Sequence, residues 1–287
     1  MALIANILFP VDFSQSCVAM APFVKRTAAI TSAKVTLLHV LGGSASGFDL
    51  YVRPPHEVAG DRSSAAREKL KSFLKSEFPA DKSSRLLGAG DAAEGIVQVT
   101  REGGFDLITM PTHAGVFRRT LLGSTTAKVL NDADSPVLTT QHAETMAPRR
   151  LEHREWVCVI GLEEDSRRVL RYARQIAETF HANLSLVHAI PGTEPGLRVQ
   201  LGLEEQTESA EKRAARQRIE ELQRAAGMRA PVTIAVGPIK DALIEAARRL
   251  RADVLVIGRS PEPGSVGRMR DLTYAMVRDA PCPVLSV

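Results

Sequence analysis

The stretch Val35-Thr36-Leu37-Leu38-His39-Val40 occurs a second time, in altered form, as Leu184-Ser185-Leu186-Val187-His188-Ala189. The two histidines are 149 positions apart. Each stretch is a short, mostly apolar run, which is typical of a strand buried in a parallel sheet. A strand pattern that returns once in 287 residues indicates a duplicated domain.

Three further pairs of stretches keep the same order. They are Ile7–Val11 with Val157–Gly161, Asp106–Met110 with Asp253–Ile257, and Ser135–Leu138 with Cys282–Leu285, at offsets of 150, 147 and 147 positions. Because the offset drifts so little, we expect two copies of one domain of about 140 residues. The polar stretch Gln141–Arg154 separates them, so we set the domains at 1–142 and 155–287 with 143–154 as the linker.

Helical stretches alternate with the strands in both copies. We expect helices at Ser16–Ile30, Ala65–Phe78, Asp91–Glu102, Ser124–Asn131, Asp165–Phe180, Glu204–Ala226, Lys240–Leu250 and Leu272–Asp279. This alternation predicts an α/β fold of two tandem, doubly wound, five-stranded parallel-sheet domains. Ligands of such sheets bind at the carboxyl ends of the strands, where the strand order switches.

Each copy ends in a short apolar strand, Pro136–Thr140 and Pro283–Val287. Each of these strands would leave an exposed sheet edge in an isolated domain. Pairing the two edges satisfies both sets of backbone groups, so we predict an intramolecular pseudo-dimer.

The composition argues against several classes of protein. The chain has 37 Lys and Arg against 33 Asp and Glu, and its densest charged stretch, Glu204–Arg229, mixes both signs as a solvated helix face does. We therefore expect no nucleic-acid partner.

No run approaches the ~18 apolar residues of a membrane span, and Met1–Val11 resembles a first strand more than a signal peptide. The 3 widely spaced cysteines without a C-x-x-C motif fit reduced thiols in a cytoplasmic protein.

Several reactive side chains have simpler structural interpretations. We expect His39, His113 and His188 to be hydrogen-bonded residues at strand ends rather than metal ligands. Ser14 and Ser16 are expected to be helix N-caps, and Cys17 a buried, inert thiol. The chain has neither a P-loop nor a G-x-G-x-x-G motif after a strand, so we find no enzyme signature.

Taken together, these fragments resemble the universal stress protein family. In the first copy the resemblance lies in Pro10-Val11-Asp12-Phe13-Ser14, Leu37–Val40, Thr112-His113, Leu121–Ser124 and Ser135–Leu138, and in the second in Leu186–His188, Val254–Gly258 and Ala280–Val284. It implies a tandem member of the family with Rossmann-like domains related to the adenine nucleotide α-hydrolases. It also implies a role in stress response, pairing through the last strands and, as in many members, binding of ATP or AMP without strong hydrolysis.

The resemblance also implies a site in the first copy. Nucleotide-binding members carry Gly, two residues, Gly, nine residues and then Gly-Ser or Gly-Thr after the fourth strand. Here Pro111 and Ala114 stand at the first two glycines, and the loop is one residue short. Asp12 stands at the position where members of the family contact the adenine or ribose with an Asp. Val40 stands where a backbone contact to adenine is expected. The candidate nucleotide-binding residues are Pro10, Asp12, Val40, Met110, Pro111, Thr112, Ala114, Gly123, Ser124, Thr125 and Thr126.

The second copy departs further from the signature. Gly258 is kept, but Pro261 and Arg270-Asp271 replace the later glycines and serine, and Leu162 stands at the position of Asp12. We expect no cofactor there, and Asp271 to cap its own helix. The loop Pro263–Arg268 is either a site for another anion or an ordinary loop.

Two functions remain open. One is weak binding of ATP or AMP in the first copy, and the other is a regulatory or protein-interaction module that binds no nucleotide. The sequence leaves the protein partner, the stress signal and the formation of a homodimer undetermined.

Overall fold

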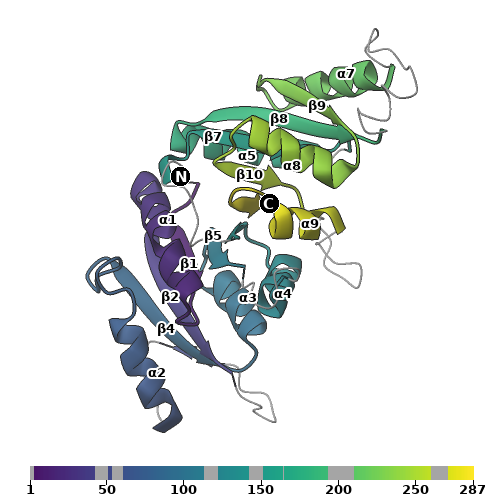
Figure 1. Cartoon of the computed structure of the whole chain (residues 1–287). Helices are drawn as coiled ribbons and strands as arrows, with labels where there is room; N and C mark the ends of the chain where they lie inside the picture. Colours follow the sequence, from purple (N-terminus) through teal and green to yellow (C-terminus); the bar gives the residue numbers. More distant parts are fainter. Residues whose placement is uncertain are drawn as a thin grey trace.

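The structure is a computed structural model of the whole chain (Figure 1). It describes residues 3–42, 51–53, 61–112, 122–141, 151–163, 165–192, 210–259 and 271–287. The linker stretch 142–150 lies outside these ranges, so the boundaries set from the sequence stay a prediction.

Strands and helices alternate along the chain. The strands are β1 (Asn6–Pro10), β2 (Lys34–Leu41), β3 (Tyr51–Arg53), β4 (Ser83–Ala89), β5 (Leu107–Pro111), β6 (Val137–Thr140), β7 (Glu155–Val159), β8 (Asn183–Ile190), β9 (Val232–Val236), β10 (Val254–Ile257) and β11 (Val284–Ser286). The helices are α1 (Gln15–Thr31), α2 (Asp61–Ser72), α3 (Ala92–Glu102), α4 (Ser124–Asp132), α5 (Ser166–Phe180), α7 (Ala210–Ala225), α8 (Ile239–Arg249) and α9 (Asp271–Asp279). We call the half with β1–β6 the first repeat and the half with β7–β11 the second repeat.

The described strands form one sheet of 11 strands in the order β3-β4-β2-β1-β5-β6-β11-β10-β7-β8-β9. Pairing is parallel within each repeat apart from β3, so the predicted α/β class and doubly wound topology are confirmed. In both halves the strand order switches beside the first strand of the repeat, where crossovers leave in opposite directions. This is the point at which a cleft opens in such sheets.

The last strands of the two repeats pair with each other, as predicted. β6 and β11 run antiparallel, with Thr139 opposite Val284 and Leu138 opposite Leu285. The Thr139 hydroxyl also donates to the carbonyl oxygen of Val284, at 3.3 Å. Neither last strand is left as an exposed edge, and the two repeats share one sheet.

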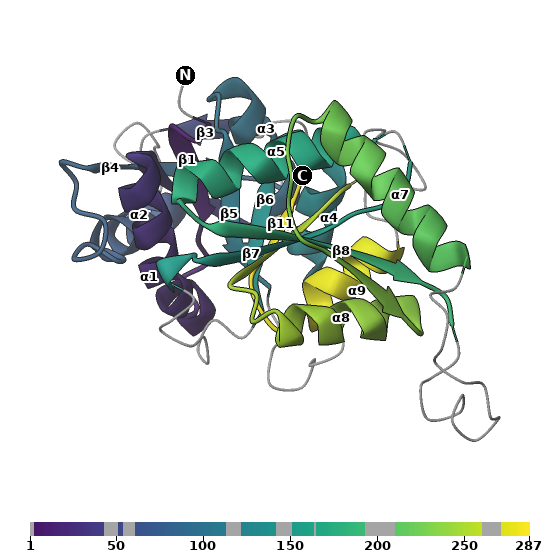
Figure 2. The same cartoon turned by 90° about the horizontal axis from the view of Figure 1, so that it is seen from above.

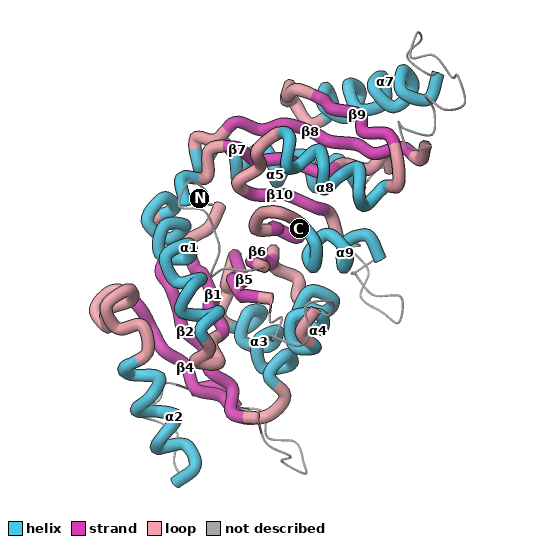
Figure 3. Tube along the Cα trace, viewed as in Figure 1, coloured by secondary structure: helices cyan, strands magenta, loops and turns pink. Residues whose placement is uncertain are grey.

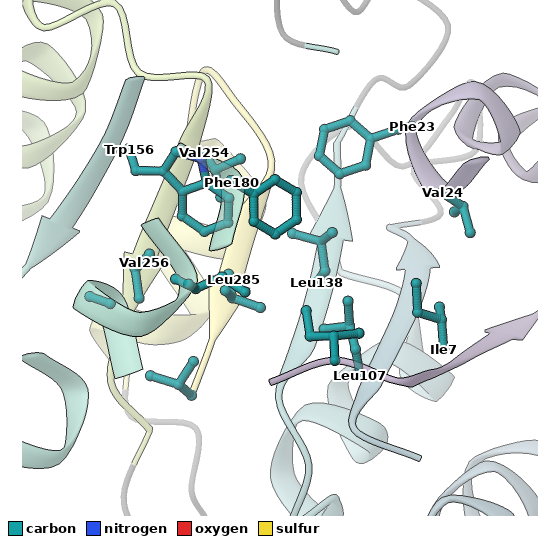
Figure 4. Close-up of a cluster of buried hydrophobic side chains, with 14 of the residues drawn as sticks. Ile7, Phe23, Val24, Leu107, Leu138, Trp156, Phe180, Val254, Val256 and Leu285 are labelled. Atoms are coloured by element: carbon teal, nitrogen blue, oxygen red, sulfur yellow. The ribbon is translucent and has the colours of Figure 1, made fainter. Parts of the chain in front are cut away.

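Two helical layers cover the sheet, and each continues from one repeat into the other. One buried apolar cluster includes residues of α1, α2, α5 and α7, and the other includes residues of α3, α4, α8 and α9. Figure 2 shows α5 and α7 above, and α8 and α9 below, strands β7 and β8. Figure 4 shows side chains of the first cluster, with Leu138 of one repeat and Leu285 of the other. The core is therefore continuous across the junction.

Three details differ from the sequence-based expectations. The first repeat has a sixth strand, β3, which pairs antiparallel with the end of β4, Leu87–Ala89. The helix expected at Ala65–Phe78 spans Asp61–Ser72, because the chain turns at Leu74 with a positive φ of 51°. Ser14 is the N-cap of α1, but Ser16 lies inside that helix, so its predicted capping role is wrong.

A histidine without hydrogen-bonded ring nitrogens lies where the repeats meet. His153 is 1% exposed, and its ring centroid is 4.5 Å from Phe23 of α1 and 4.8 Å from Phe180 of α5. Neither ring nitrogen has a hydrogen-bond partner among the described residues. Burial lowers the pKa of His153 from 6.5 to about 3, so the ring is neutral in the folded chain.

Candidate functional site

A cavity of about 510 Å³ opens in the first repeat where the strand order switches. Its walls come from the carboxyl ends of β1, β2 and β5, from α3, and from the N-terminus of α4. Pockets that bind small ligands have volumes of about 300–1,000 Å³. Pro10, Val11, Asp12, Cys17, Leu38, His39, Val40, Ala92, Ile96, Met110, Pro111, Leu122, Gly123, Ser124, Thr125 and Thr126 line it.

The N-terminus of α4 presents hydrogen-bond donors to this cavity. The helix follows Gly123, which supplies no side chain, and its first turn contains no acidic residue. In contrast, the Asp91 carboxylate caps α3 by accepting from the backbone N–H groups of Ala93 and Glu94. The first N–H groups of a helix have no partner within the helix and carry partial positive charge. This end of α4 is thus suited to an anion.

A carboxylate, that of Asp12, also lines this cavity. Asp12 follows β1, and its Oδ1 accepts from the Ser14 backbone N–H at 2.9 Å and from the Cys17 thiol at 3.2 Å. Burial raises the pKa of Cys17 to about 12, so the thiol remains a proton donor rather than a nucleophile. The two bonds orient the carboxylate. Cys17 is buried, as predicted, and its inertness stays a prediction.

The turn after Asp12 has an uncommon backbone conformation. Phe13 has a positive φ of 66°, which costs about 1–2 kcal/mol for a residue with a side chain. Its ring packs against His39, at a centroid distance of 4.3 Å, and against Phe73, at 5.2 Å. Packing of Phe13 therefore holds the turn on which Asp12 lies.

The histidines near the ends of the second strands form hydrogen bonds with backbone carbonyl groups. His39 Nδ1 lies 2.7 Å from the Val11 carbonyl oxygen, and His188 Nδ1 lies 2.9 Å from that of Ile160. Burial lowers the pKa of His39, which favours a neutral ring that donates from Nδ1. Their predicted hydrogen-bonded role is confirmed, whereas His113 lies outside the described residues. The described residues contain no cluster of three or more metal-ligating side chains.

Most of the predicted site residues meet in the cavity. Nine of the eleven line it, and among the residues that the structure describes only Thr112 does not. The Thr112 hydroxyl donates to the Thr140 carbonyl oxygen at 3.1 Å, and Ala114 lies outside the described residues. The lining residues of α3, Ala92 and Ile96, were not predicted, although the apolar face of that helix was readable in the sequence.

The second repeat has a smaller cavity of about 260 Å³ at the equivalent place. Leu162 stands at the position of Asp12, but two carboxylates that were not predicted, those of Glu163 and Asp165, line this cavity. The Asp271 side chain, Pro261 and the loop Pro263–Arg268 lie outside the described residues. Two carboxylates at the rim oppose the binding of an anion by Coulomb repulsion.

The model of the universal stress protein family matches residues 4–141 and, a second time, residues 154–287. The chain belongs to this family. It is a tandem universal stress protein whose two family domains share one sheet. No curated protein sequence matches the chain.

Solved structures share the fold over the whole length. A universal stress protein from Archaeoglobus fulgidus DSM 4304 is 20% identical, with a TM-score of 0.73 over 98% of this chain and 97% of that one. A protein of unknown function from Pseudomonas aeruginosa PAO1 is 17% identical, with a TM-score of 0.65 over 99% and 92%. At these identities the likeness establishes the tandem fold.

Another match spans a single repeat. A universal stress protein solved in complex with cAMP is 26% identical over 47% of this chain and 96% of its own, with a TM-score of 0.33. In the described part of this chain, none of the helices has the length and apolar character needed to cross a membrane.

Proposed function

We propose that the first repeat binds an adenine nucleotide, ATP or AMP, and that the protein acts in stress response by binding rather than by catalysis. The observation that carries the proposal is the presence, in one cavity, of the Asp12 carboxylate and of the N-terminus of α4, to which Gly123 gives no side-chain cap. These groups suit the two polar ends of a nucleotide.

The base and ribose belong at the Asp12 end. A carboxylate accepts hydrogen bonds from the adenine amino group or from ribose hydroxyls. Leu38, Ile96 and Met110 line the same cavity and offer apolar contact to the faces of the base. Val40, at the end of β2, supplies backbone groups beside it.

The phosphates belong at the α4 end. Backbone N–H groups of the first turn and the hydroxyls of Ser124, Thr125 and Thr126 are donors for phosphate oxygens. Pro111, at the place of the first family glycine, has no N–H to offer. We therefore expect weaker binding than a complete set of glycines and donors would give.

Calorimetric titration of the full chain with AMP and with ATP tests the proposal. We expect weak binding that Asp12→Ala abolishes. Glu163→Ala is the matched control because it removes a carboxylate from the other cavity, and its affinity should equal that of the unmodified chain.

Unchanged affinity in Asp12→Ala would remove the assignment of this site. An absence of binding at millimolar ATP and AMP would favour the second function, a regulatory or protein-interaction module of the same fold.

A further inference from the structure

Residues of the second repeat hold both ends of α4. At its N-terminus, the Leu122 backbone N–H donates to the Tyr274 hydroxyl at 3.1 Å. At its C-terminus, the Arg259 guanidinium donates to the carbonyl oxygens of Leu130 at 2.7 Å, Ala133 at 3.0 Å and Ser135 at 2.8 Å. Figures 1 and 3 show α9, which carries Tyr274, next to α4 at the junction.

Arg259 is built into the junction rather than lying on its surface. Its side chain is only 5% exposed, and its backbone N–H donates to the Val287 carbonyl oxygen at 2.7 Å. The Arg168 guanidinium of α5 donates to the Arg259 carbonyl oxygen at 3.0 Å. The last carbonyl groups of a helix carry partial negative charge, so a buried guanidinium there satisfies and stabilises that helix end.

Tyr274 acts directly beside the proposed ligand site. Leu122, whose N–H it accepts, lines the first cavity and immediately precedes Gly123. Arg278 lies one turn further along α9, with its guanidinium 5.8 Å from the centroid of the Tyr274 ring. The hydroxyl thereby fixes the turn from which the α4 donors project.

At the equivalent positions the first repeat does not carry these two side chains. By the 147-residue offset, Ala127 corresponds to Tyr274 and Thr112 to Arg259. Alanine has no hydroxyl, and the Thr112 hydroxyl donates within its own repeat, to Thr140. Tyr274 and Arg259 of the second repeat therefore make contacts with the first repeat that Ala127 and Thr112 cannot make with the second.

We propose that Tyr274 and Arg259 are positioning residues for the first-repeat site: they hold α4 so that its N-terminal donors face the cavity. This inference rests on the proposed function for its ligand, but the contacts that position α4 do not require a bound ligand. The second repeat is then a support for the site of the first.

Hydrogen exchange of the full chain without ligand tests the positioning in Tyr274→Phe. Losing one hydrogen-bond partner should speed amide exchange at residues 122–127 roughly fivefold, with little change elsewhere. Tyr172→Phe is the matched control: the buried Tyr172 hydroxyl has no hydrogen-bond partner among the described residues, so its loss should leave residues 122–127 unchanged. Equal exchange at residues 122–127 in Tyr274→Phe and the unmodified chain would overturn the proposal.

AMP titration of the same variants tests the consequence for binding. We expect affinity to fall several-fold in Tyr274→Phe and to stay constant in Tyr172→Phe. Faster exchange with unchanged AMP affinity would overturn the positioning role. If the unmodified chain binds neither AMP nor ATP, the proposed function fails, while the exchange measurement still decides whether the second repeat holds α4.

Discussion

The two cavities of this universal stress protein occupy equivalent places in equivalent domains, yet their chemistry differs. The first, of about 510 Å³, combines the Asp12 carboxylate with the N-terminus of α4, to which Gly123 gives no side-chain cap. The second, of about 260 Å³, is lined by two carboxylates and by Arg259, whose guanidinium is directed into the first repeat. We propose from this comparison that one domain of the duplicated chain binds the ligand and that the other supports it.

The largest effect is expected from removing that support. Arg259→Met should lower the free energy of unfolding by about 4 kcal/mol, because it leaves three carbonyl groups at the end of α4 without their charged donor. Thr112→Val at the equivalent position is the control, with a loss of about 1 kcal/mol for its single hydroxyl bond. Urea denaturation measures both, and equal losses would contradict the asymmetry.

Acid should weaken the junction between the repeats. The folded chain keeps His153 neutral down to about pH 3, whereas an unfolded histidine binds a proton near pH 6.5. The contribution of this residue to stability is therefore complete above about pH 6.5 and declines as the pH falls toward 3. Between pH 7.5 and 4.5 the loss should be about 2–3 kcal/mol.

Urea denaturation at those two pH values, with His153→Phe, isolates the effect. The variant should lose less stability on acidification than the unmodified chain by that amount. His181→Asn, at an exposed histidine, is the control and should behave like the unmodified chain. An identical pH dependence in His153→Phe would show that the buried ring does not govern the junction.

A smaller effect is expected from making the first cavity resemble the second. Ser124→Asp places in the first repeat the residue that stands at the equivalent position, Asp271, in the second. The carboxylate should stabilise the start of α4 by roughly 0.5 kcal/mol but repel phosphate, lowering AMP affinity at least tenfold. Ser124→Asn, which is uncharged, should retain most of the affinity, and calorimetry separates the two. Equal affinities would exclude phosphate from this end of the cavity.

Much of the fold was predictable from the sequence because it depends on local patterns. Three features were predicted from such patterns, and all three agree with the structure: the repeated strands, their alternation with helices and the pairing of the apolar last strands. The strand β3 was not predicted, because three residues within a long connecting stretch give no periodic signal. The early end of α2 depends on a backbone turn at Leu74. Leucine is not a residue type that predicts a turn with positive φ.

The candidate site was less predictable where it depends on contacts between distant residues. Asp12 and Gly123 could be placed by motif, since each follows a strand or begins a helix. Glu163 was missed because alignment by a fixed offset selected its neighbour, Leu162. The reach of Arg259 from the end of β10 to α4 depends on how the two repeats dock, which no local pattern encodes.

The stoichiometry of nucleotide binding tests the central claim most directly. Native mass spectrometry of the full chain with AMP, over a range of concentrations, counts the ligands bound to each molecule. The difference between the cavities predicts a single AMP per chain, lost in Asp12→Ala and kept in Glu163→Ala. Two bound AMP molecules, or one that persists in Asp12→Ala and disappears in Glu163→Ala, would contradict the assignment of the ligand site to the first repeat.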